Sequence, residues 1–162
     1  MSLDSKPRQR LSQAGLLFAA STFSLLAMAG DLAIRSELES SRSVADIAQH
    51  GFRNEATLSQ HGLANVSMIA QQGVMNTAIS VQQGSGNSAY ILQDGTLNEA
   101  NILQQGQGHD ALIAQQGISQ SALIQQTGLG GGAMLLQQGS SQVPVSIIQH
   151  ARGRMQVQVI QQ

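Results

Sequence analysis

The chain has 162 residues, a length typical of one domain, but only 10% of its residues are charged and 2% are aromatic. From residue 30 onward, five arginines stand against eight acidic residues, which argues against nucleic acid as a partner. The absence of cysteine excludes a disulfide framework and a thiolate zinc site. Large side chains are too few for a layered core, so small apolar residues, backbone hydrogen bonds and side-chain amides must hold the fold.

The N-terminus has the three-part pattern of a secretory signal peptide. Basic residues Lys6, Arg8 and Arg10 precede an apolar run at 16–29, which ends in a small-x-small cleavage site. A membrane-spanning helix would need about 20 apolar residues, and charged residues end this run sooner. Residues 1–29 are therefore predicted to be removed on export.

Glutamine then recurs with a strict period of eleven residues in nine successive units, at Gln49, Gln60, Gln71, Gln82, Gln93, Gln104, Gln115, Gln126 and Gln137. Glycine follows each glutamine by two residues, at Gly51, Gly62, Gly73, Gly84, Gly95, Gly106, Gly117, Gly128 and Gly139. Asparagine lies three residues after the glycine in the first five units, at Asn54, Asn65, Asn76, Asn87 and Asn98. The unit reads N-x-A-x-I-x-Q-x-G-x-x, and internal repetition of this kind indicates a stacked architecture.

An eleven-residue period fits either a right-handed coiled coil or a strand followed by a turn. A glycine in every unit would cost a helix about 1 kcal/mol each time relative to alanine. The segment 98–104 alternates with a period of two, which brings its Asn, Ala, Ile and Gln onto one face of a strand. The charged flanks of a coiled coil are missing. We therefore favour strands, with turns at the repeated glycines.

Two units make one rung of 22 residues, so residues i and i+22 lie directly above each other. The sequence predicts an all-β fold, a stacked strand-turn-strand β-solenoid of about five 22-residue rungs with amyloid-like strand stacking. Glutamine and asparagine then form columns in which each amide bonds to the copies above and below it. A buried amide is costly when it is unpaired, and such a ladder pairs it throughout the stack.

The predicted organisation has four parts. The signal peptide at 1–29 is followed by a non-repeat segment at 30–48, whose acidic residues and serines favour disorder. Regular repeats occupy 49–136, and an atypical terminal repeat occupies 137–162.

The terminal repeat departs from the pattern in its spacing and in its composition. The next glutamines, Gln149 and Gln161, are each twelve residues after the previous one. Pro144 falls where the unslipped register predicts the inward face of a strand, although proline cannot donate a ladder hydrogen bond. Upstream, glycine at Gly131 removes the amide from its column.

Arg152 and Arg154 are the only basic residues after Arg53. One interpretation is a decayed repeat that caps the stack. Another is a distinct contact with a partner or with the cell surface, and the two interpretations are compatible.

No catalytic or cofactor-binding set stands out in the sequence, which predicts a protein without enzymatic activity. The four histidines, His50, His61, His109 and His150, have no carboxylate or cysteine at ligand spacing, so no metal site is predicted. They are interpreted as solvent-facing residues of turns and flanks. The glycines follow the repeat period and not that of a phosphate-binding loop.

The Gln-x-Gly-x-x-Asn-x-Ala core of the unit resembles the curlin repeat of bacterial curli fibres over residues 49–162. The deviant last rung with its arginines, and the loss of asparagine in later units, are more similar to the minor subunit, the fibre nucleator, than to the major one. The resemblance implies secretion through a dedicated curli export pore with accessory factors, to the surface of a Gram-negative cell. There the chain would enter an extracellular fibre involved in biofilm formation and cell adhesion.

The resemblance also implies partners, namely the major curlin subunit and copies of the chain itself, with no nucleic acid and no small-molecule substrate. The major subunit would be templated by strand addition, because open strand edges carry unpaired N–H and C=O groups. The glutamine and asparagine columns would set the register of addition. Two alternatives remain open: the chain is the major fibre subunit, or it is a monomeric β-solenoid adhesin or binding module.

Overall fold

A computed structural model describes residues 42–140 and 142–162 of the chain. The predicted signal peptide and residues 30–41 lie outside the described residues. The described part is built of strands, with bounds β1 Val44–Phe52, β2 Glu55–Leu63, β3 Val66–Val74, β4 Thr77–Ser85, β5 Ser88–Thr96, β6 Glu99–Gln107, β7 Asp110–Ile118, β8 Ser121–Ser140 and β9 Val145–Gln161.

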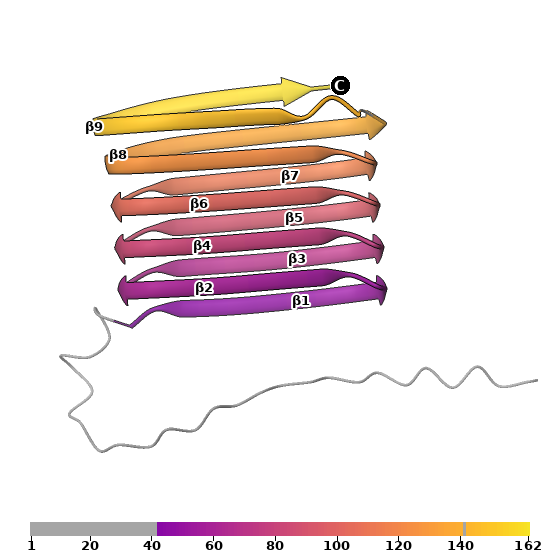
Figure 1. Cartoon of the computed structure of the whole chain (residues 1–162), viewed down its shortest axis with the longest axis horizontal. Coiled ribbons are helices and arrows are strands. Elements are labelled where there is room, and N and C mark those ends of the chain that lie inside the picture. Colours follow the sequence, from indigo (N-terminus) through magenta and orange to yellow (C-terminus); the bar gives the residue numbers. More distant parts are fainter. Residues whose placement is uncertain (1–41, 141) are drawn as a thin grey trace, which may run out of the picture. The chain divides into compact units, whose positions relative to one another are not determined.

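The strands stack in parallel and alternate between two facing layers (Figure 1). Layer A contains β1, β3, β5 and β7, followed by the second half of β8 and the second half of β9. Layer B contains β2, β4 and β6, followed by the first half of β8 and the first half of β9. Each strand residue of β1 to β7 pairs with the residue 22 positions later, as Ile69 does with Ile91. The predicted all-β solenoid of about five 22-residue rungs is therefore confirmed.

The core between the layers is thin because alternate residues of each strand face inward. Alanine and isoleucine fill most of the inward positions, and the central members Ala78, Ile91 and Ile102 are fully buried. In the second rung two inward positions carry serine, and the hydroxyl of Ser67 donates to that of Ser80 at 2.7 Å. Narrow side chains let the two layers lie close enough for amides to reach across.

The repeated glycines have a different role from the predicted one. The sequence predicts turns at these glycines, but the structure places them within strands, next to the last residue in β1 to β7. The left-handed corner residue lies two positions later, and at Arg53, Ala64, Met75 and Leu97 it is not glycine. Glycine is needed in the strand because a Cβ on Gly84 would overlap the backbone carbonyl of the rung above.

β9 continues the stack in a shifted register. Val145 pairs with Ala122, which is 23 residues earlier, and Gln161 pairs with Gln137, which is 24 residues earlier. The prediction that Pro144 lies on the inward face of a strand is wrong. Pro144 is exposed in the connection before β9, because an additional residue in this connection moves the strand start to Val145. The shift keeps a residue without a backbone N–H out of the hydrogen-bonded ladder.

Candidate functional site

The glutamine side chains form two continuous columns, one in each layer. From Gln49 to Gln137 every column Nε2 donates to the Oε1 of the glutamine one rung later, at distances of 2.6–2.9 Å. From Gln60 to Gln137 the same Nε2 also donates across the core to a backbone carbonyl of the other layer, as Gln82 does to Val66 at 2.9 Å. Gln82 and Gln126 are at most 1% exposed. Each glutamine of these columns from Gln60 to Gln137 is thus paired both across the core and between rungs.

Asparagine supports the corners in a second set of columns. The Oδ1 of Asn54 accepts the backbone N–H of Asn76 at 3.0 Å, and its Nδ2 donates to the carbonyl of Gly73 at 3.0 Å. The remaining asparagines repeat both contacts with the rung above. The glutamine columns therefore join the strands, and the asparagine columns join the corners.

His109 occupies an asparagine position and performs the same role. Its side chain is fully buried, so the interpretation of this histidine as solvent-facing is wrong, whereas His50, His61 and His150 are exposed. The His109 ring lies 3.1 Å from the Gly128 carbonyl through Nε2, and its Nδ1 accepts the N–H of Gly131 at 3.1 Å. These contacts require a proton on Nε2 and none on Nδ1, so the ring is the neutral tautomer.

Replacement of His109 by asparagine is therefore expected to leave the stability of the fold within about 1 kcal/mol of the original. Replacement by leucine would leave the Gly128 carbonyl and the Gly131 N–H unpaired and should cost about 3 kcal/mol. Guanidinium unfolding followed by circular dichroism measures both, with the exposed His61→Leu as control. An equal loss for asparagine and leucine would contradict the role of the imidazole as a substitute amide.

Sequence reasoning missed four members of the columns. Ser43 lies one rung before Asn65 and accepts its backbone N–H at 3.2 Å, so the structural repeat begins at Ser43, before residue 49. Gln120 donates to the Gly139 carbonyl at 3.1 Å from an asparagine position. Gln149 and Gln161 extend the glutamine columns. Their spacing of twelve residues was the available signal. One residue is added in each of these two units, and the pairing shifts by one residue each time, so the glutamine side chains still lie in the columns.

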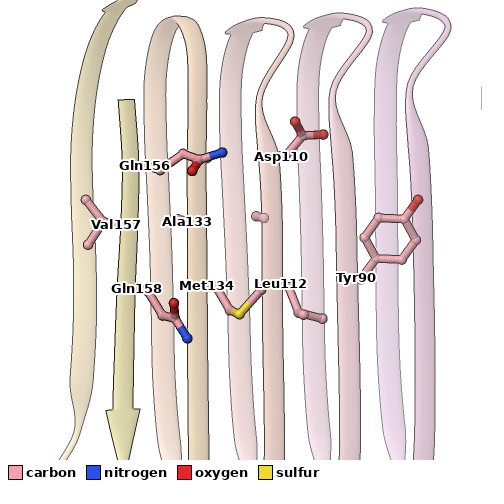
Figure 2. Close-up of a pocket in the computed structure, with 10 residues that line it drawn as sticks. Tyr90, Asp110, Leu112, Ala133, Met134, Gln156, Val157 and Gln158 are labelled. Carbon is pink, nitrogen blue, oxygen red and sulfur yellow. The ribbon is translucent and has the colours of Figure 1, made fainter. Parts of the chain in front are cut away.

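The outer face of layer A carries an open groove of about 440 Å³ (Figure 2). It exists because Gly132 lacks a side chain between Asp110 and Gln156, while Tyr90 and Met134 border it. Among the lining residues only Asp110 has a charged side chain. The groove offers apolar contact with one carboxylate at its rim, and its lining holds no nucleophile paired with a base.

Arg152 and Arg154 are exposed on β9, in the last part of the stack. Within residues 42–140 and 142–162 no three His, Cys, Asp or Glu side chains gather as metal ligands would. The same residues contain no helix with the length and hydrophobicity of a membrane span.

A parallel β-solenoid joined along its length by side-chain amide ladders belongs to the class of structural repeat proteins. The family model of the curlin associated repeat matches residues 95–128, which include β6 and β7. No curated protein and no solved structure gives a significant match. The family match supports the resemblance to the curlin repeat and fits a protein without enzymatic activity.

Proposed function

We propose that the protein is a subunit of an extracellular curli-type fibre and that it acts as the nucleator, on which a more regular subunit adds by strand pairing. The observation that carries the proposal is the uniform register of 22 residues from β1 to β8, with each column glutamine from Gln49 to Gln137 bonded to the rung above. A partner with the same period can continue both the backbone ladder and the amide columns.

The irregular last rung supports the role of nucleator over that of the major subunit. Its register is shifted, and Arg152 and Arg154 are exposed there, while Gly131 replaces an asparagine at a corner before it. A subunit that repeats along a fibre needs two ends that match each other, whereas a nucleator needs only one extending end. We assign the other end, residues 137–162, to contact with the cell surface.

We further propose that residues 1–29 direct export, that the sequence between residue 30 and the first rung is a polar segment, and that the mature chain leaves the cell through the curli export pore. The sequence pattern of a signal peptide supports this route. On this proposal the glutamine and asparagine columns carry assembly, and the chain needs no cofactor.

Seeding kinetics test the proposed function. The purified mature chain is added in small amount to a major curlin subunit, and thioflavin T fluorescence is followed. A lag shorter than that of the unseeded subunit is expected, because a preformed end replaces the slow nucleation step. Fibre growth of the chain alone, without any seeding of the major subunit, would instead support the role of major subunit. No fluorescence in either reaction would favour a monomeric solenoid.

A further inference from the structure

The two ends of the stack differ in the hydrogen-bonding groups that they present. All glutamine ladders run in one direction, since each Nε2 donates toward the rung of higher residue number. The N-terminal end therefore presents acceptors, the Oε1 atoms of Gln49 and Gln60. Within the described part of the chain no side chain donates to either of them.

The corner of the first rung is open in the same way. In higher rungs an asparagine side chain accepts the N–H of Asn76 and donates to the carbonyl of Gly73. The equivalent groups one rung earlier are the N–H of Asn54 and the carbonyl of Gly51. Among the described residues, no asparagine from a preceding rung serves these two groups. In contrast, the second corner is occupied, because Ser43 accepts the N–H of Asn65 at 3.2 Å.

At the C-terminal end the layer B column is closed, whereas at the N-terminal end it is open. In layer B the last glutamine, Gln149, donates its Nε2 to the carbonyls of Gly132 at 3.2 Å and Met155 at 3.4 Å. The Met155 carbonyl takes the place of the glutamine that a further rung would bring. β9 thereby ends the layer B column within the chain.

We infer that the growing end of this protein is the edge formed by β1 and β2, and that its partner is the C-terminal end of a second subunit with unshifted 22-residue rungs. This inference rests on the proposed function. The last rung of such a partner would donate glutamine N–H groups to Gln49 and Gln60, and its corner asparagine would serve Asn54. At the C-terminal end of this chain the layer B glutamine donor, Nε2 of Gln149, is already bonded to Gly132 and Met155, so the edge formed by β1 and β2 favours a different, more regular subunit over another copy.

The test uses the complete absence of cysteine from the chain, which makes one introduced thiol unique. His61 and His150 occupy the first and last rungs of one outward column of layer B, and both are exposed. His61→Cys and His150→Cys are each coupled to a polyethylene glycol maleimide. The labelled mature chains are then compared with the unlabelled variants as seeds for a major curlin subunit.

Polymer at position 61 is expected to return the lag to that of the unseeded reaction, while polymer at position 150 leaves seeding intact. Equal seeding by the two labelled chains, or loss with the label at 150 alone, would overturn the assignment of the growing end. Failure of the unlabelled variants and of the original chain to seed would instead refute the proposed function. A second variant, Gln49→Leu with Gln60→Leu, should also lengthen the lag, whereas His50→Leu with His61→Leu on the same strands should not.

Discussion

Replacement of Gly84 by alanine is expected to destabilise the stack by at least about 3 kcal/mol, because two independent costs coincide at this residue. Its φ of +121° lies in a region that L-residues rarely adopt. An added Cβ would also overlap the backbone carbonyl oxygen of Gly106 in the next rung. The overlapping atoms belong to the backbone of Gly106 and not to a side chain that can rotate away, so the rungs would have to separate. Guanidinium unfolding followed by circular dichroism measures the loss.

Gly86 provides a matched control only two residues away. It also has a positive φ, of +64°, but a Cβ added there meets nothing within 4 Å. Ala64 occupies the same corner one rung earlier with a φ of 53°, so Gly86→Ala reproduces a residue that the chain already accommodates. A cost of about 1 kcal/mol is expected for the control. Similar unfolding midpoints for the two variants would contradict the close approach of the rungs at Gly84.

Replacement of Gln82 by leucine should have the second large effect, because it interrupts a fully buried ladder without a large change in volume. The Val66 carbonyl and the Oε1 of Gln104 would lose their donor, and the Nε2 of Gln60 would lose one of its acceptors. Each unpaired buried polar group costs about 1–3 kcal/mol, so a total loss of about 3 kcal/mol is expected. The assembly rate should fall as well, since the interrupted column can no longer enforce the register.

The neighbouring Gln83 makes the comparison specific to the buried column. Its side chain is exposed on the outer face of the same strand. Gln83→Leu changes the chemistry in the same way but should alter stability by no more than about 0.5 kcal/mol. Unfolding midpoints and thioflavin T kinetics are measured for both variants. If Gln82→Leu assembled and unfolded like Gln83→Leu, the glutamine columns would not be the main source of order.

The period of the sequence was sufficient to predict the strands, their inward faces and their register. A single alternation rule places Ala100, Ile102 and Gln104 on the inward face, and the structure buries all three. The same rule correctly places Leu92 and Leu103 outside, where they are 44% and 41% exposed. Residue type alone was enough to predict the inward and outward faces, because every unit packs the same residue types at the same positions.

Where the chain departs from its own pattern, the sequence was less informative. His109 differs from asparagine in residue type, but its two ring nitrogens reproduce the donor and acceptor of an amide, which only the geometry reveals. The corners were misjudged because glycine is associated with turns, whereas Gly84 is required by close approach within a strand. The closure by Met155 uses a backbone carbonyl, which no side-chain pattern encodes.

Uniform rungs leave the alignment of the two layers undetermined, because shifting one layer by a whole rung against the other would still place alanine opposite isoleucine and glutamine opposite a backbone carbonyl. The hydroxyl pair of Ser67 and Ser80 removes this ambiguity. After such a shift Ser67 would face Leu58 or Ile102, the residues paired beside Ser80 in layer B. A buried hydroxyl without a partner is costly. These two serines therefore fix the alignment of the two layers at the second rung, in a core that otherwise repeats by translation from rung to rung.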